Sequence, residues 1–323
     1  MLNLKGKHWV SAIALLALAG CATPATQGVQ TEAAHASVIE DGQKIVMATH
    51  SFNVFISPLR APDGVGPLNK LAAEGGKTGQ EFLAVQMIGG STPMQHWNQG
   101  DGDESKNIAK AALREHAGEV DVFTMSPNAI MPEDGIDLFG DLVIETNPQA
   151  RILVQNNWSG WDGNGTTAAV GGRMEDITFV NADRDKTTDA MIDKWLSDLH
   201  GPGGYLERMR TQLEGIDERA GRQITYVVPS ADAVYTLRKL VNAGEVPGVE
   251  KQSDLFRDPI GHPKDEIVHL VSYVWYAMVY HESPVGLMSF VDDSDPTSAA
   301  RERLLQEIAW AAVLNEPKSG VKA

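Results

Sequence analysis

The chain of 323 residues carries 43 acidic and 27 basic side chains, which gives a formal net charge of −16. Such a surface repels phosphate backbones and anionic lipid headgroups, so the composition argues against a nucleic-acid partner. The chain has one cysteine, which excludes an internal disulfide.

Residues 1–20 are predicted to be a lipoprotein signal peptide. Two lysines near the start precede the apolar stretch 9–20, which is too short to span a bilayer. Residues 18–21 (LAGC) resemble the lipobox, the bacterial signal for lipidating a cysteine and cleaving before it. The alternative is an ordinary secretory signal followed by a chance cysteine. We therefore expect Cys21 to carry lipid.

The segment 21–43 is expected to be a flexible tether, because it is rich in Ala, Thr, Gln and Ser and only weakly patterned. No later stretch is apolar for long enough to cross a bilayer, so membrane contact would come from acyl chains on Cys21. Residue 22 is Ala rather than Asp. By similarity to Gram-negative lipoproteins, this favours the outer membrane, at its periplasmic face or the cell surface.

Strands and helices are predicted to alternate along residues 44–323, which we expect to form a single domain. Short apolar runs predict strands at 44–49, 81–87, 120–126, 150–156 and 223–228. Helical patterns cover 66–74, 105–117, 134–146, 187–219, 230–243, 263–281 and 297–314. Such alternation is typical of βαβ units, so the sequence predicts a three-layer α/β/α fold with a central parallel sheet.

Three polar residues suggest a nucleophile, a base and an orienting carboxylate. Ser51 comes where the first strand ends, at the edge of the sheet where open α/β folds bind ligands. Asp258 and His262 lie in 258–263 (DPIGHP), just before a long apolar helix. A serine hydroxyl needs a base to take its proton, and the base needs a partner that fixes its tautomer. The alternatives are a helix-capping serine and a surface histidine beside a turn-forming aspartate.

The order of these residues resembles that of the SGNH (GDSL-type) hydrolases, over about residues 44–290. In that order Ser51 follows the first strand, Gly90 the second and Asn128 the third, with Asp258 and His262 near the end. The turn HSF is similar to a divergent branch with His-Ser-Phe or Asn-Ser-Phe in place of Gly-Asp-Ser. The likeness extends over 120–128 (VDVFTMSPN) and 265–287 (DEIVHLVSYVWYAMVYHESPVGL).

This resemblance implies a flavodoxin-like fold and a serine esterase. Ser51 would be the nucleophile, His262 the base and Asp258 its partner. The backbone N–H groups of Ser51 and Gly90 and the amide of Asn128 would form the oxyanion hole. The implied substrate is an ester or O-acetyl group on a glycan or small molecule, cleaved through an acyl-enzyme without a cofactor.

Two departures from the family pattern keep alternatives open. The family spaces its acid and histidine as Asp-x-x-His, and the spacing here is one residue longer, so Asp254 or Asp265 could take the acid's place. The family's Gly-x-Asn-Asp is missing around Asn128, so Asn156 and Asn157 are alternative donors. The same departures motivate a rival function, a non-catalytic binding or structural lipoprotein that retains the fold.

Metal chemistry has little support in the sequence, which lacks His-Glu-x-x-His and a P-loop. The acidic runs 101–104 (DGDE) and 292–295 (DDSD) could hold calcium, but solvated acidic loops are commoner. We therefore expect no metal site, and a metal-dependent phosphoesterase is the third possibility.

A long loop rich in Gly, Asn and Asp spans 157–185. Its Trp158 and Trp161 could stack on a sugar or pin the loop to the core. His50 is adjacent to Ser51, but neighbouring side chains on extended backbone point apart, so it is not expected to be the base. The two histidines of the apolar C-terminal region, His269 and His281, are expected to be structural.

Overall fold

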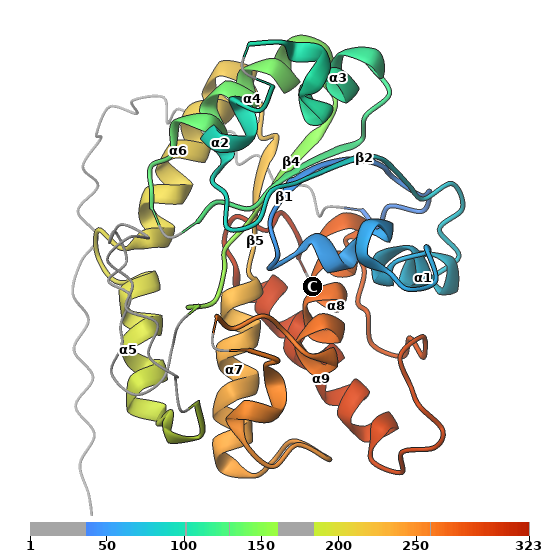
Figure 1. Ribbon diagram of the computed structural model, residues 1–323, viewed down its shortest axis with the longest axis vertical. Helices are drawn as coiled ribbons and strands as arrows, with labels where there is room; N and C mark the ends of the chain where they lie inside the picture. Colours follow the sequence, from blue (N-terminus) through green and yellow to red (C-terminus); the bar gives the residue numbers. More distant parts are fainter. Residues whose placement is uncertain (1–36, 101, 129, 161–183, 259, 323) are drawn as a thin grey trace, which may run out of the picture. The chain divides into compact units, whose positions relative to one another are not determined.

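Five parallel strands form one sheet in the computed structural model, which describes residues 37–100, 102–128, 130–160, 184–258 and 260–322. The predicted signal peptide, Cys21 and most of the tether lie outside the described residues. The strand order is β2-β1-β3-β4-β5 (Figure 1). Their bounds are Lys44–Thr49 (β1), Glu81–Met87 (β2), Val122–Met125 (β3), Arg151–Gln155 (β4) and Thr225–Val228 (β5).

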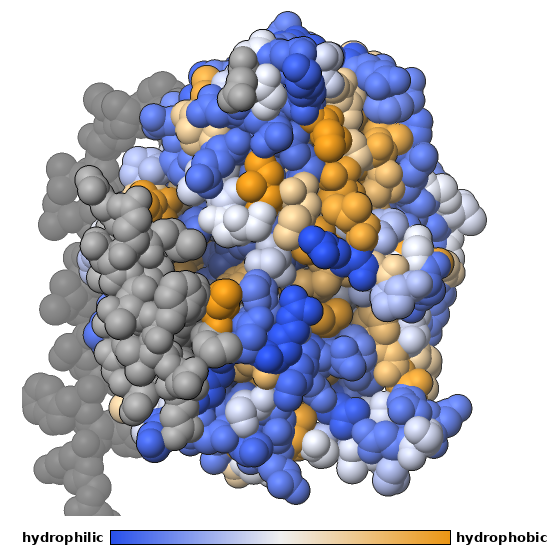
Figure 2. Space-filling model, in the orientation of Figure 1, coloured by the Kyte–Doolittle hydropathy of each residue, from blue (hydrophilic) through white to orange (hydrophobic). Residues whose placement is uncertain are grey.

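All five strands lie where the apolar runs predict them, because each run has the length and burial of a core strand. β3 and β4 are buried almost throughout, whereas β2 is an edge strand with partly exposed side chains. Figure 2 shows hydrophobic side chains gathered over β2, where Phe82, Leu83 and Val85 are only partly covered.

Helices cover both faces of the sheet (Figure 1). On one face lie α2 (Pro93–Trp97), α3 (Ile108–Glu115), α4 (Asp134–Thr146) and α6 (Tyr205–Ala220). On the other lie α1 (Pro67–Glu74), α7 (Ser230–Ala243), α8 (Asp265–Tyr280) and α9 (Ser298–Asn315). α5 (Asp189–His200) packs beside α6 and α7. The predicted three-layer arrangement is therefore confirmed.

The predicted helix over 187–219 is wrong in one respect, since it is two helices. α5 ends at His200 and α6 begins at Tyr205, with residues 201–204 (GPGG) between them. Proline lacks the N–H that a continuing helix needs, and three glycines lower the cost of leaving the helical conformation. The sequence therefore carried a stop signal that the longer periodic pattern obscured.

The strand order reverses between β1 and β3. The chain leaves β1 for β2 on one side and returns to β3 on the other, and both neighbours pair with β1 in parallel. Ligands of open α/β sheets bind at such a switch point, outside the carboxyl ends of the strands. Ser51 follows β1 directly at this place.

α8 runs from the carboxyl edge of the sheet back to its amino edge. The half-buried Arg151, the first residue of β4, donates hydrogen bonds to the carbonyls of Met278 (3.1 Å) and Val279 (2.8 Å) at the end of α8. The N–H of Ile39 binds the carbonyl of Tyr280 at 2.9 Å. The chain therefore enters the domain at the amino edge, opposite Ser51.

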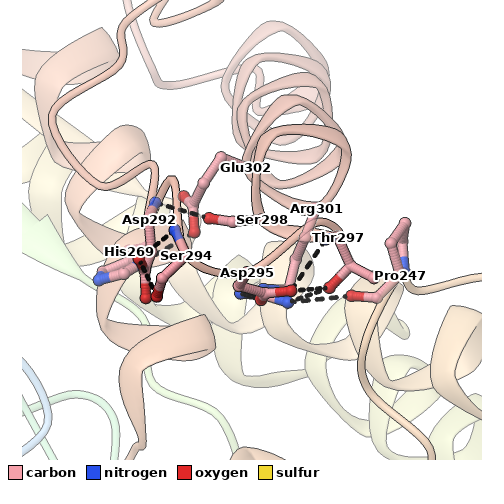
Figure 3. Close-up of polar contacts among 9 residues, drawn as sticks. All are labelled: Pro247, His269, Asp292, Ser294, Asp295, Thr297, Ser298, Arg301 and Glu302. Atoms are coloured by element: carbon pink, nitrogen blue, oxygen red, sulfur yellow. Dashed lines mark hydrogen bonds and ion pairs between the residues drawn. The ribbon is translucent and has the colours of Figure 1, made fainter.

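The acidic run 292–295 lies just before α9 and is held by local hydrogen bonds (Figure 3). Asp292 accepts from the N–H and hydroxyl of Ser294, and Asp295 accepts from Thr297 and from Arg301 at 2.8 Å. These bonds and ion pairs lower the pKa of both carboxyls, that of Asp295 to about 2. Its oxygens are thus used in local structure, and in the described part of the chain no cluster of His, Cys, Asp or Glu suits a metal ion.

His269 has a structural position between α8 and α9. Its Nδ1 lies 2.9 Å from a carboxylate oxygen of Glu302, which is 1% exposed (Figure 3). Tyr273 donates its hydroxyl to the same carboxylate at 3.0 Å, and Phe290 stacks on the imidazole at 4.2 Å. A buried carboxylate with two partners avoids the cost of burying an unpaired charge, so this cluster joins the last two helices.

Candidate active site

Ser51 lies in a turn that begins as soon as β1 ends. The N–H groups of Asn53 and Val54 both bind the carbonyl of His50, at 3.3 and 3.1 Å, and start the short 3₁₀ helix Val54–Ile56. The turn carries the half-buried Ser51 to the carboxyl edge of the sheet.

Ser51, His262 and Asp258 form one hydrogen-bonded chain. Ser51 Oγ lies 2.8 Å from His262 Nε2, and His262 Nδ1 lies 2.5 Å from Asp258 Oδ2. A carboxylate can only accept, so Nδ1 carries the proton and Nε2 accepts from the serine hydroxyl. Residues 211 positions apart are thus brought together. This is the geometry that activates a serine nucleophile.

A turn accommodates the extra residue between Asp258 and His262. Asp258 Oδ1 accepts from the N–H groups of Gly261 and His262, both at 3.2 Å, while its other oxygen binds the imidazole. Gly261 has φ +95°, which side-chain-bearing residues rarely adopt. The longer spacing therefore still allows the contact. Asp254 instead accepts from the N–H groups of residues 250 and 251, and Asp265 is exposed in the first turn of α8.

The electrostatics of the Asp258 carboxyl favour its charged form. Burial opposes ionisation, but the hydrogen bonds from the His262 ring, its backbone N–H and that of Gly261 outweigh burial, so the pKa of Asp258 is lowered. Asp258 is therefore an anion beside the imidazole at neutral pH, where it can stabilise the imidazolium that forms when His262 accepts a proton.

Gly90 and Asn128 meet at the same edge of the sheet. The side-chain amide of Asn128 donates to the carbonyl of Gly90 at 3.0 Å, which links the loops after β2 and β3. Gly90 has φ +63°, and Tyr205 donates its hydroxyl to the carbonyl of Asn128 at 3.0 Å. Both candidate donors thus lie in loops that adjoin the end of β1.

The two alternative amides are used elsewhere. Asn156 accepts from the N–H of Ala231 at 2.9 Å and donates to Asp232 at 3.0 Å, at the start of α7. Asn157 donates to the carbonyl of Pro127 at 2.7 Å. Asn157 therefore supports the loop that carries Asn128.

Trp158 pins the loop after β4 and supports the histidine. It is 2% exposed, stacks on Phe52 at 4.7 Å, and donates its indole N–H to the carbonyl of Gly261 at 3.1 Å. Phe52 in turn meets the His262 ring edge-on at 5.7 Å. Of the two interpretations of Trp158, the core contact is the one observed, while Trp161 lies outside the described residues.

His50 is the residue whose role the sequence did not reveal. It is buried, its Nδ1 accepts from the N–H of Phe52 at 3.2 Å, and its Nε2 lies 3.1 Å from Ser126 Oγ. Burial, with a smaller contribution from the nearby His96 and His262, lowers its pKa to about 4. The only sequence signal for such a role is that His50 is adjacent to Ser51. Because neighbouring side chains on extended backbone point apart, this adjacency predicts no contact between the two.

No protein-family model and no curated protein matches the chain. Among solved structures, a DUF4886 family protein from Bacteroides uniformis is similar, with a TM-score of 0.50 and 12% identity over 85% of this chain and 96% of that one. A proposed SGNH hydrolase from Slackia heliotrinireducens has a TM-score of 0.36 and 13% identity, over 73% of this chain and 98% of its own. A proposed GDSL-like lipase from Parabacteroides merdae has a TM-score of 0.38 and 12% identity, over 73% of this chain and 95% of its own. The first likeness shows a shared fold.

The part of the chain that the structure describes contains no helix with both the length and the apolarity to cross a membrane.

Proposed function

We propose that this chain is a serine hydrolase of the SGNH type that cleaves ester bonds. The observation that supports it most is the unbroken chain from Ser51 Oγ through His262 to Asp258, with distances of 2.8 and 2.5 Å. The order of the motifs in the sequence resembles the same family. A histidine with only a structural role can have any polar partners, whereas His262 has a partly exposed serine hydroxyl on one ring nitrogen and a carboxylate on the other.

In the proposed reaction Ser51 Oγ attacks the carbonyl carbon of the ester, and its proton passes to His262 Nε2. The oxyanion accepts from the N–H groups of Ser51 and Gly90 and from the amide of Asn128, each worth about 3 kcal/mol in the transition state. Collapse breaks the bond to the alcohol, which leaves with the proton from His262. Water, deprotonated by the same imidazole, then cleaves the acyl-Ser51 ester, so ester and water become acid and alcohol.

We infer that the substrate is an O-acyl group on a glycan or a small molecule, by analogy with the family alone. The proposed site of action is the cell envelope, with lipid on Cys21 and the outer membrane as the supporting surface. Labelling with a radioactive fatty acid tests the anchor, because the label should enter the wild-type chain and be absent from Cys21→Ser.

Turnover of a short-chain aryl acetate by residues 22–323 tests the reaction. We expect turnover and labelling by a fluorophosphonate, both lost in Ser51→Ala. A folded protein that neither turns over esters nor takes the label would favour the binding lipoprotein. Activity that survives Ser51→Ala and disappears with a chelator would favour a metal-dependent phosphoesterase.

A further inference from the structure

His50 uses both ring nitrogens inside the protein. Nδ1 accepts from the N–H of Phe52 at 3.2 Å, so in the neutral imidazole Nε2 carries the proton and donates to Ser126 Oγ at 3.1 Å. The acceptor side chain and the N–H two residues later close a turn, as asparagine and aspartate do in Asx turns. Ser51 is the residue inside this turn.

The residue after the nucleophile is held on both sides. His50 binds the N–H of Phe52, and Gln155 Nε2 donates to the carbonyl of Phe52 at 3.2 Å. Gln155 is itself fixed, because its Oε1 accepts from Trp275 Nε1 at 2.6 Å and from Ser230 Oγ at 3.1 Å. The peptide groups flanking Phe52 therefore have little freedom to rotate.

The same network reaches the loop of the candidate oxyanion hole. Ser126 Oγ, which accepts from His50, can donate to Asn157 Oδ1 at 3.2 Å. Gln155 Nε2 donates to the same Asn157 oxygen at 2.7 Å, and the Asn157 amide donates to the carbonyl of Pro127 at 2.7 Å. Pro127 immediately precedes Asn128. One buried network thus connects the turns that follow β1, β3 and β4.

We propose that His50 is a positioning residue that holds Ser51 within reach of His262 and aligns the Ser51 turn with the Asn128 loop. The inference rests on the proposed function, since it assigns His50 a task in that reaction. His50 is not a second base, because Nδ1 is occupied by a backbone N–H and Nε2 is the donor to Ser126. Misplacing a reacting group by about 1 Å costs roughly 10² in rate, so such support matters.

The variants His50→Asn and His50→Leu separate positioning from bulk stability. The Asn side-chain oxygen can take the place of Nδ1 and close the same turn, whereas Leu fills the space without an acceptor. We expect His50→Asn to keep kcat within about fivefold of wild type and His50→Leu to lose about 10² in kcat, with KM changed less than threefold. His281→Asn is the matched control, because it also removes a partly buried imidazole, at the opposite edge of the sheet beside Arg151. Its kcat should equal wild type.

Amide hydrogen exchange of Phe52 supplies a readout that does not depend on activity. The Phe52 N–H should be protected in wild type and His50→Asn and should exchange at least tenfold faster in His50→Leu. Equal protection in all three, wild-type kcat in His50→Leu, or equal losses of kcat in both variants would each overturn the inference. Failure of the proposed function would be recognised differently, as equal turnover in wild type and Ser51→Ala, and the Phe52 amide would still report on the turn.

Discussion

Replacing Asp258 by Asn should lock His262 in the wrong tautomer. Asp258 Oδ1 accepts from two backbone N–H groups, so the Asn oxygen should occupy that side and its NH₂ should face His262 Nδ1. Nδ1 must then accept, which leaves the proton on Nε2, and Nε2 can no longer take the proton of Ser51. The substitution should therefore remove both the charge and the base.

The expected loss of kcat can be estimated from the charge of Asp258 alone. A carboxylate and an imidazolium about 4 Å apart attract by about 4 kcal/mol at an effective dielectric constant of about 20. The His262 side chain is 17% exposed and that of Asp258 is 31% exposed, so this dielectric constant suits the site better than that of water. Four kcal/mol corresponds to about 10³ in kcat, and the tautomer effect adds to it, so we expect a loss of 10³–10⁴ in Asp258→Asn.

The assay is kcat for a short-chain aryl acetate at neutral pH, measured together with Asp258→Ala and Asp254→Asn. The Ala variant should lose somewhat less than the Asn variant, since it leaves both tautomers accessible. Asp254→Asn should keep wild-type kcat, because Asp254 binds backbone N–H groups away from the imidazole. If Asp258→Asn kept more than a tenth of wild-type kcat, the assignment of Asp258 would be wrong.

Three further predictions concern stability and its link to the site. Gly261→Ala should lower the free energy of unfolding by about 1–2 kcal/mol and also lower kcat, because it strains φ +95° beside the histidine, whereas Gly64→Ala, at φ +71° in open space, should leave kcat unchanged. Urea unfolding and turnover together check this pair, and equal kcat in both variants would count against it. Glu302→Gln should lower the free energy of unfolding in urea by about 1–3 kcal/mol without changing kcat, because it weakens the buried cluster between α8 and α9. A loss of kcat without a loss of stability would contradict this prediction. His50 and His96, the latter in α2, are both buried, and burial lowers the pKa of each to about 4. Both imidazoles therefore stay neutral in the folded protein down to about pH 4, whereas in the unfolded chain they bind protons below about pH 6.5. The free energy of unfolding should therefore fall as the pH drops from 6.5 to 4, by about 3 kcal/mol for each imidazole. Urea midpoints that stay constant over this range would show that the two histidines are not held neutral by the fold.

The fold could be predicted from local patterns because the strands of a parallel sheet are continuous apolar runs. β1 and β2 have the bounds that their runs indicate, and β3 differs by only a few residues. The break between α5 and α6 was missed because helical periodicity continues on both sides of residues 201–204. The strand order is a property of long-range pairing, which no local window contains.

The contact between Ser51 and His262 could be anticipated only through the order of the motifs. Asp258 and His262 are one residue further apart than in the family pattern, and Gly261 accommodates the extra residue at positive φ, a backbone conformation that a count of residues does not contain. The contribution of His50 could not be inferred, since its partner Ser126 lies 76 positions away and meets it only in the folded protein.

Lys44 opens β1 at the amino edge of the sheet, one strand length away from the turn at Ser51. The chain therefore joins β1 at the edge of the sheet that lies away from Ser51, so a change made before Lys44 does not touch the residues around the serine directly.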